Sequence, residues 1–345
     1  MGKVSKIKLG VVFVLSFAMA VSVSQLGSKS AYAAKVLKIS HQWAGGTIDK
    51  GDYRDRFCRV FAKKVEDRTN GELKFRVYPS ATLYKAKEQY DALVKGGLDI
   101  TLYPLAYKAG KIPELSITHM PCIVKNYEQG LRWRDAPIGE EIARLCKENG
   151  VTIISWTYAR GGIGSKSKLI KLPDDLKGVK IRAADKMFNS MLLTAGASIV
   201  SMPSSEAYFA LQTGVLDAMM TSNSSFLSYH LYEQIKYYNS TRERSIFHMF
   251  VPLLISNTTF KNLSPKQQKI VMEVGREMQK WAMDEGDKED ELSIKTMEQK
   301  GVNVYDMTVN DFNKWRDFSE KTAWEKFIKE VKGGKELVDM ATSVK

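Results

Sequence analysis

Residues 88–99 read EQYDALVKGGLD, and residues 206–217 read EAYFALQTGVLD. Each segment reads as a helix closed by a glycine, because glycine readily adopts the left-handed turn that ends a helix, and a strand follows directly. Identical residues recur at one constant offset: Glu88, Tyr90, Ala92, Leu93, Gly96, Leu98 and Asp99 match Glu206, Tyr208, Ala210, Leu211, Gly214, Leu216 and Asp217. Such turns are common, so coincidence is the alternative, but a match of this density favours a repeated unit. We therefore expect two similar α/β lobes.

Helices and strands alternate around these two segments. VLKISHQW (36–43) and LKFRVYP (73–79) read as strands, and the helical pattern between them stops near Asn70-Gly71. This alternation predicts α/β lobes with mostly parallel sheets. In open α/β sheets, ligands bind outside the carboxyl ends of the strands. We therefore expect the loops after the matched strands, at 103–105 and 221–223, to line a cleft between the lobes.

The C-terminal part predicts one long helix. Ser264 reads as its N-cap, Pro265 as its first residue and Gln267 as the capping-box partner. A helical stripe of apolar residues follows: Ile270, Val274, Met278 and Trp281. A helix of about 36 residues would measure roughly 54 Å at 1.5 Å per residue, long enough to run across both lobes. Two helices broken near Gly286 are the alternative.

The N-terminus has the features of a secretory signal peptide. Lysines precede an apolar run from Leu9 to Val23, and Ala31-Tyr32-Ala33-Ala34 supplies a small-residue cleavage site. The apolar run is short for a membrane span, which needs about 20 residues; an uncleaved anchor is the alternative. We expect residues 1–34 to be removed and the mature chain to be soluble and exported.

Charge and motifs narrow the function. The formal charge of +13 falls to +9 without segment 1–34, which holds four lysines and no acids. The charge is mixed along the chain with no arginine-rich arm, so we expect an anionic small molecule rather than nucleic acid as partner. The three cysteines, Cys58, Cys122 and Cys146, allow one disulfide, but the sequence does not choose a pairing.

Enzyme signatures are weak. RGGIGSKS (160–167) lacks the Gly-Lys-Ser/Thr of a phosphate loop, and no G-x-S-x-G or H-E-x-x-H occurs. The four histidines are scattered, so we expect no metal, no cofactor and no catalytic residue. A periplasmic hydrolase that uses His41 or His248 is the alternative.

Two arginines have informative contexts. Arg160 follows the apolar strand VTIISWTYA (151–159), where the chain would cross into the second lobe, and Arg182 lies in a short strand within DLKGVKIRAAD (175–185). The guanidinium fork matches a carboxylate and stays charged. Two arginines at a cleft suit an anion; an inter-lobe or surface ion pair is the alternative.

Three stretches resemble one family. ELKFRVYPSATLYKAKEQYDALVKGGLDI (72–100), LPDDLKGVKIRAAD (172–185) and SSEAYFALQTGVLDAM (204–219), in this order behind a signal peptide, resemble the DctP-type solute-binding proteins of TRAP (tripartite ATP-independent periplasmic) transporters. The resemblance covers nearly the whole mature chain. It implies a two-lobe periplasmic receptor that closes on an organic acid and delivers it to a membrane permease. It also implies that Arg182 pairs with the ligand carboxylate and that Arg160 assists.

The resemblance implies further ligand contacts, although this sequence differs from the family pattern at several of these positions. A family asparagine that contacts the ligand falls on Thr221, with Asn223 two residues on. The first strand ends in His41-Gln42-Trp43, and Gln42 stands where sialic-acid binders carry an asparagine. Their glutamate after the first-lobe strand is replaced by Tyr103-Pro104.

These departures suggest the ligand class. A buried hydroxyl without a partner costs roughly 1–3 kcal/mol, so sugar acids need many polar contacts. This cleft instead offers aromatic candidates: Trp43, Tyr103, Trp156, Tyr158 and Phe188. Residues of this kind are more often core than ligand contacts, and the positions at strand ends favour Trp43 and Tyr103. We expect a carboxylate with an apolar or aromatic body. A sugar-acid or C4-dicarboxylate receptor and an ABC-type receptor are the alternatives.

The domain boundaries follow from the expected chain crossings. We expect lobe I at 35–157 plus about 246–283, and lobe II at 158–245 plus about 284–345. The hinge strands are expected near Tyr158-Ala159 and Arg244–Ile246, and the protein is expected to be a monomer.

Overall fold

The computed structural model describes residues 34–345, and the predicted signal peptide, apart from its last residue, lies outside the described residues. One sheet has the strand order β2-β1-β3-β11-β4 and forms the first lobe. Its strands are β1 (Lys35–Ser40), β2 (Leu73–Tyr78), β3 (Ile100–Leu102), β4 (Val151–Ser155) and β11 (Leu253–Ser256).

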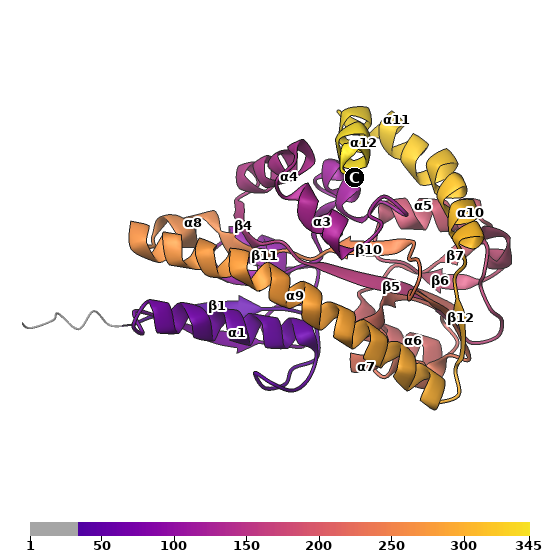
Figure 1. The fold of residues 1–345 in the computed structure, drawn as a ribbon, viewed down its shortest axis with the longest axis horizontal. Coiled ribbons are helices and arrows are strands. Elements are labelled where there is room, and N and C mark those ends of the chain that lie inside the picture. The colour runs from indigo at the N-terminus through magenta and orange to yellow at the C-terminus, as the bar shows by residue number, and fades with distance from the viewer. Residues whose placement is uncertain (1–33) are drawn as a thin grey trace, which may run out of the picture. The chain divides into compact units, whose positions relative to one another are not determined.

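The other sheet has the order β12-β9-β5-β8-β6-β7, with β10 paired to β5, and forms the second lobe (Figure 1). Its strands are β5 (Tyr158–Ser165), β6 (Lys180–Arg182), β7 (Ser198–Ile199), β8 (Ala218–Ser222), β9 (Tyr237–Ser240), β10 (Phe247–Phe250) and β12 (Asn303–Asp306). The two-lobe α/β architecture is as the sequence predicts.

The two sheets are mixed, so the prediction of mostly parallel sheets is wrong. β1 runs parallel to β2 and β3, and β6 runs parallel to β7 and β8. β11 is antiparallel to β3 and β4, and β5 is antiparallel to β8, β9 and β10. β5 and β11 each enter their sheet directly from the other lobe, without the long crossover connection that joins parallel neighbours.

The sequence repeat is a structural repeat. Helix α2 (Gln89–Val94) precedes β3, and α6 (Ala207–Gln212) precedes β8. The glycines that end the two helices have φ of 78° at Gly96 and 76° at Gly214, in the left-handed region that favours glycine. The backbone N–H of Leu98 donates to Ala92 at 3.3 Å, and that of Leu216 donates to Ala210 at 3.0 Å. The prediction of a repeated unit is confirmed.

Apart from the passage through α9 to β12, the chain crosses between the sheets at two places, which contact each other. The first crossing joins β4 to β5 through residues 156–157, just before the expected Tyr158-Ala159, and the second joins β10 to β11 through residues 251–252. The Val251 N–H donates to the Thr157 carbonyl at 2.8 Å. The second crossing lies later than the expected Arg244–Ile246, because β10 pairs with β5; Phe247–Phe250, which we expected in lobe I, therefore belongs to the second sheet.

The long helix α9 runs unbroken from Pro265 to Gln299 and includes Gly286. Ser264 and Gln267 form the predicted capping box. The helix packs on α1 (Tyr53–Arg68) and β4 in the first lobe and on β5, β12 and α7 (Asn223–Ser228) in the second (Figure 1). A Cβ at Gly275 would lie 1.9 Å from the Ile154 carbonyl oxygen, so glycine permits this close approach to β4.

Shorter helices complete both lobes. They are η1 (Leu105–Lys108), η2 (Pro113–His119), α3 (Tyr127–Trp133), α4 (Pro137–Glu148), η3 (Pro173–Leu176), α5 (Lys186–Thr194), η4 (Ser204–Glu206), η5 (Leu231–Gln234), α8 (Asn257–Lys261), α10 (Val309–Ser319), the π-helical η6 (Glu320–Trp324), α11 (Glu325–Glu330) and α12 (Gly334–Ser343). Cys58, Cys122 and Cys146 are buried free thiols. Within the described range, every helix is too short or too polar to span a bilayer.

Candidate functional site

Arg182 ends β6 and is almost completely buried, with 1% of its surface exposed. Its Nε donates to the Met202 carbonyl and its Nη1 to the Met220 carbonyl, both at 2.9 Å. Its Nη2 donates to the hydroxyl oxygen of Tyr107 at 3.2 Å, across from the first lobe. Within residues 34–345, Arg182 forms no ion pair with an aspartate or glutamate.

A buried guanidinium without an anion is electrostatically incomplete. Burial of a charge is expensive unless an opposite charge and hydrogen bonds compensate for it. The partners of Arg182 are neutral, so they satisfy hydrogen bonds without neutralising the charge. The guanidinium has five N–H groups, and the contacts above use one on each nitrogen, which leaves one N–H on each terminal nitrogen. These two N–H groups remain available to an anion.

Gln42, two residues after the end of β1, faces this arginine from the first lobe. Its side chain is buried, and its Nε2 donates to the Tyr107 hydroxyl at 3.4 Å. Its backbone carbonyl accepts a hydrogen bond from the hydroxyl of Tyr229, of the second lobe, at 2.9 Å. Gln42, Tyr107 and Arg182 thus meet beyond the carboxyl ends of β1 and β6, where open α/β sheets bind ligands.

A cavity of about 430 Å³ opens beside Tyr107. This volume lies within the range of about 300–1,000 Å³ that is usual for small-molecule sites. Three lysines but one acid, Asp185, are among its lining residues: Lys87, Ala106, Tyr107, Ala109, Gly110, Ala184, Asp185, Lys186, Asn189, Ser190, Leu193, Ser201 and Lys326. Both lobes contribute to this wall, and the excess of cations suits an anionic ligand.

Arg160, the other arginine singled out in the sequence, contacts α9 instead. Its Nε lies 3.0 Å from Asp290 Oδ2 and its Nη2 lies 3.1 Å from Asp287 Oδ1. Its guanidinium lies 5.3 Å from the ring centre of Tyr127. The structure does not bring Arg160 into contact with the partners of Arg182, and its role in ligand binding stays a prediction.

His41 and Trp43 lie beside Gln42 but are held by partners within the first lobe. His41 Nε2 lies 3.0 Å from Asp55 Oδ1, and both side chains are fully buried. Burial raises the pKa of Asp55, but hydrogen bonds from His41 and Arg59 outweigh this effect and lower it below the usual value. The Trp43 ring packs under the guanidinium of Arg54 at 4.5 Å.

Thr221 and Asn223 lie at the end of β8 and the start of α7, as predicted. Thr221 pairs with Gly162 of β5 in the sheet ladder. The Asn223 amide donates to Thr241 Oγ1 at 2.7 Å, and its carbonyl oxygen accepts from the Tyr238 hydroxyl. Asn223 is therefore directed into the second lobe, and no contact joins it to Arg182 within the described chain.

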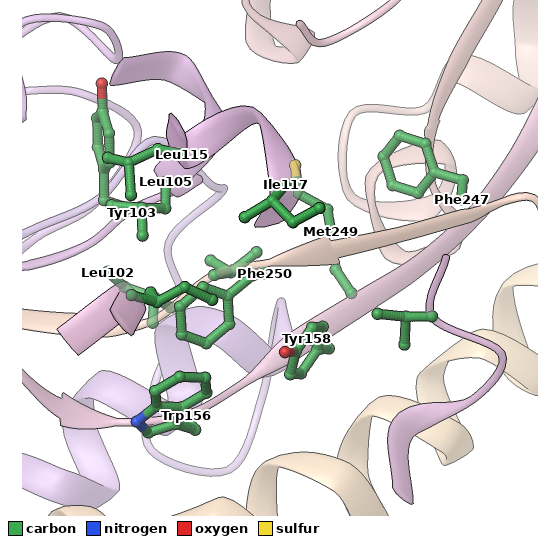
Figure 2. Close-up of a cluster of buried hydrophobic side chains, with 14 of the residues drawn as sticks. Leu102, Tyr103, Leu105, Leu115, Ile117, Trp156, Tyr158, Phe247, Met249 and Phe250 are labelled. Atoms are coloured by element: carbon green, nitrogen blue, oxygen red, sulfur yellow. The ribbon is translucent and has the colours of Figure 1, made fainter. Parts of the chain in front are cut away.

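The predicted aromatic contacts are packed in the interior. Figure 2 shows Tyr103, Trp156 and Tyr158 in one buried cluster around Phe250, whose ring centre lies 4.6 Å from Trp156 and 5.1 Å from Tyr158. Phe188 belongs to the same core and packs 4.6 Å from the ring of His119 and 5.7 Å from that of Phe247. Tyr103 comes nearest to the candidate site, because its ring contacts that of Tyr107 at 5.9 Å.

Sequence reasoning missed two residues, Tyr107 and Arg54. Tyr107 lies in the loop region after β3, which the repeat had already placed at the cleft, but nothing local distinguished it from Tyr103. Arg54 is 2% exposed; its guanidinium binds both oxygens of Asp52 at 2.8 and 2.5 Å and donates to Ser222 Oγ of the second lobe at 2.8 Å. A helix-start arginine beside an aspartate carries no local signal of a cross-lobe contact.

The described residues offer no obvious metal site. Between residues 34 and 345, no group of three or more histidine, cysteine or acidic side chains is placed to hold an ion. Of the four histidines, His41 contacts Asp55 and His119 contacts Asp185. Burial lowers the pKa of His248 to about 3, so this side chain is neutral at physiological pH.

Comparison with known proteins places these features in context. The profile of the bacterial extracellular solute-binding protein family 7 (DctP) matches residues 46–330. A solute-binding protein of Albidiferax ferrireducens is 42% identical over 306 residues, which cover 88% of this chain and 90% of the relative. These matches give no support to the alternatives of an ABC-type receptor or a hydrolase.

Solved structures agree. A TRAP periplasmic solute-binding protein from Rhodoferax ferrireducens, with bound malonate, superposes with a TM-score of 0.88 at 40% identity, over 89% of this chain and 98% of that one. One from Sulfitobacter sp., with bound β-D-galacturonate, has a TM-score of 0.81 at 22% identity, over 90% and 100% of the two chains, which shows the shared fold. Both are solute receptors and not enzymes.

Proposed function

Because the chain belongs to bacterial extracellular solute-binding protein family 7, the DctP-type receptors of TRAP transporters, we propose that it binds a small organic acid through Arg182. The receptor is exported to the periplasm by its signal peptide, acts as a monomer and delivers the acid to the membrane permease of a TRAP transporter. It needs no cofactor.

One observation carries the proposal: the buried guanidinium of Arg182 has neutral partners within the described chain. A ligand carboxylate supplies the missing negative charge, and charge-assisted hydrogen bonds to it are about twice as strong as neutral ones. The two unused N–H groups give the carboxylate a place to bind. Arg182 therefore acts as the anchor of the acid group.

Lobe closure completes the site. Arg182 belongs to the second lobe, whereas Gln42 and Tyr107 belong to the first, so a ligand on Arg182 meets the other two as the lobes come together. The crossing strands, joined by the hydrogen bond between Val251 and Thr157, act as the hinge that absorbs the motion. Closure removes water, and the weaker dielectric screening strengthens the arginine–carboxylate pair.

The body of the ligand lies in the cavity beside Tyr107. Ala106, Ala184 and Leu193 line it together with the Tyr107 ring, which supports an acid with an apolar or aromatic body. A second candidate is a dicarboxylate, favoured by the three lysines of the cavity wall and by the malonate bound to the Rhodoferax ferrireducens protein. Arg160 assists in binding the anion in either case.

Ligand discovery tests the function directly. Mass spectrometry of the compound that co-purifies with the protein identifies its class, and a thermal-shift screen of monocarboxylates, dicarboxylates and sugar acids ranks the candidates. A ligand at 100 times its dissociation constant adds about 2.7 kcal/mol of stability. We expect aromatic or aliphatic acids to shift the melting temperature; a response to sugar acids alone would contradict the proposed ligand class.

Arg182→Lys tests the anchor. Lysine keeps the charge but loses the planar fork, so we expect at least a tenfold loss of acid affinity. Arg242→Lys is the matched control, because Arg242 lies in the same lobe and pairs with Glu298 at the surface, 2.7 Å away. Equal affinities of the wild type and Arg182→Lys would remove Arg182 from the site.

A further inference from the structure

The hydroxyl of Tyr107 stands where two buried donors converge. Arg182 Nη2 lies 3.2 Å from its oxygen and Gln42 Nε2 lies 3.4 Å from it. Arg182 and Gln42 come from different lobes, and both are at most 2% exposed. Tyr107 itself is half-buried and lines the cavity of about 430 Å³, so its hydroxyl lies between the buried arginine and the open space.

These two contacts fix the polarity of the phenol. A tyrosine hydroxyl has one hydrogen to donate and an oxygen that accepts. Arg182 and Gln42 donate to the oxygen, so the hydroxyl hydrogen is left to donate. Within residues 34–345, no acceptor for this hydrogen is in place. A ligand carboxylate on Arg182 supplies that acceptor.

Gln42 contributes the complementary group. Its carbonyl oxygen Oε1 is buried and has no hydrogen-bond partner among the described residues. Because a buried polar atom without a partner is unfavourable, this oxygen needs a donor, which the ligand can supply. Nε2 and Oε1 belong to one amide group. A ligand donor that reaches Oε1 therefore lies near the Tyr107 hydroxyl.

We propose that Tyr107 and Gln42 select 2-hydroxy acids. The carboxylate binds Arg182 and accepts from the Tyr107 hydroxyl, while the hydroxyl on the adjacent carbon donates to Gln42 Oε1. An ammonium at the same carbon carries a positive charge beside the Arg182 guanidinium and is repelled, so 2-amino acids are disfavoured. Tyr107 thus acts as a specificity-determining residue. This inference rests on the proposed function, since it refines the same site.

Matched acids test the hydroxyl requirement. Isothermal titration of the wild-type receptor uses two pairs, mandelate against phenylacetate and malate against succinate, so that each pair differs by one 2-hydroxyl. We expect the hydroxy member of the pair that fits the cavity to bind at least tenfold more tightly. Gln42→Leu should remove this preference, so that the two members of a pair bind within about twofold of each other. Gln42→Met, which has similar length, replaces it if the leucine variant unfolds.

Tyrosine variants separate carboxylate binding by Tyr107 from recognition of the 2-hydroxyl by Gln42. Tyr107→Phe removes the donated hydrogen bond and should weaken both members of a pair by about tenfold without changing their ratio. Tyr90→Phe is the matched control, because Tyr90 belongs to the same aromatic group, with its ring 5.8 Å from that of Tyr103, while its hydroxyl donates to the Asn149 carbonyl at 3.4 Å, away from Arg182. We expect it to bind like the wild type, and thermal unfolding confirms that each variant is folded.

The outcomes distinguish this inference from the proposed function. Tight binding of acids without preference for the 2-hydroxyl, or a preference that survives Gln42→Leu and Gln42→Met, would overturn the 2-hydroxy selectivity and leave the receptor function intact. An unchanged affinity in Tyr107→Phe would contradict the proposed hydrogen bond from the Tyr107 hydroxyl to the ligand carboxylate. Failure of the wild type to bind any carboxylate would overturn the proposed function and this inference together.

Discussion

Arg160 of β5 and Asp290 of α9 form an ion pair, with 3.0 Å between Nε and Oδ2, that ties a crossing strand to the long helix. Asp290 also accepts a hydrogen bond from the Tyr127 hydroxyl at 2.8 Å. Burial raises the pKa of Asp290 to about 6, against the lowering effect of Arg160. Arg160 thus helps to keep the Asp290 carboxylate ionised at neutral pH, although burial disfavours its charged form.

Removal of Arg160 should therefore destabilise the fold. Arg160→Met leaves Asp290 buried without its counter-ion, and breaking a buried pair in this way costs about 3–5 kcal/mol. Urea unfolding at neutral pH measures the difference. Asp287→Asn is the control, because Asp287 pairs with the same arginine but is 55% exposed, and exposed pairs contribute about 0–1 kcal/mol. Equal losses of unfolding free energy in the two variants would contradict the claim that the pair with Asp290 stabilises the fold more than the pair with Asp287.

The unfolding free energy should fall as the pH rises from about 6.5 to 8. Glu289 accepts from the Tyr53 backbone N–H at 3.0 Å, and burial, followed by the nearby Asp52, raises its pKa to about 8. An unfolded glutamate titrates near 4.3, so the folded state holds a proton that the unfolded state has lost. Where the folded glutamate is protonated and the unfolded one is ionised, the slope of the unfolding free energy against pH approaches about −1.4 kcal/mol per pH unit. The buried His248 acts in the opposite direction, mainly below about 6.5, and its effect fades as the pH rises toward about 7.5.

Glu289→Gln should flatten this pH dependence, because the amide resembles the protonated acid at all pH values. Glu285→Gln is the matched control one turn earlier on α9. Glu285 lies 2.7 Å from Arg56, and hydrogen bonds from Lys288 and Arg56 lower its pKa despite partial burial. Urea unfolding at pH 6.5, 7.25 and 8 compares the three proteins. A slope that persists in Glu289→Gln would assign the effect to another group.

The repeat predicts unequal losses at two equivalent aspartates. Asp99 Oδ2 accepts from the Lys38 backbone N–H at 2.9 Å, and Asp217 Oδ2 accepts from that of Lys180 at 3.0 Å. Asp99 also accepts from Thr259 Oγ1 at 2.8 Å. At about 1 kcal/mol per hydrogen bond, Asp217→Ala should lose about 1 kcal/mol and Asp99→Ala about 2 kcal/mol in urea unfolding.

Asp174→Ala is the control for this pair of variants, because the Asp174 side chain is 91% exposed and its lysine partner is 3.5 Å away at the surface. We expect its stability to match the wild type. If Asp217→Ala also matched the wild type, the hydrogen bond between this aspartate and the backbone N–H would recur in both units without contributing to stability.

The features that the sequence predicted correctly depend on local chemistry. The left-handed turns at Gly96 and Gly214 and the capping box at Ser264 each lie within a few residues, so their patterns are visible in the chain. The second crossing was misplaced because the pairing of β10 with β5 joins residues far apart in sequence. The residues around β10 do not by themselves indicate which strand it pairs with.

The candidate site was predicted in part for the same reason. Arg182 and Gln42 follow from strand ends and from the family resemblance. Tyr107 becomes significant only through its approach to Arg182, which is 75 residues away. The direction of Arg160 depends on the path of α9, which supplies Asp290. The sequence shows the residue types available, whereas the cross-lobe packing decides which of them meet.

The contact of Arg54 with the second lobe should control ligand release. Arg54 Nη1 donates to Ser222 Oγ at 2.8 Å and to Ser225 Oγ at 3.3 Å, while Asp52 holds the rest of its guanidinium. These bonds join the two lobes. Arg54→Lys keeps the charge near Asp52 but cannot span both partners. We expect dissociation of a bound acid to be about tenfold faster, with little change in the association rate.

Stopped-flow tryptophan fluorescence measures both rates, and Trp43, stacked 4.5 Å under the Arg54 guanidinium, is placed to report the change. Arg59→Lys is the matched control on the same helix, because Arg59 pairs with Asp55 at 2.7 Å inside the first lobe. Since that pair makes no contact across the cleft, its loss should leave the dissociation rate unchanged. Faster release in both variants would trace the effect to α1 itself, and unchanged release in Arg54→Lys would exclude a latch between Arg54 and Ser222.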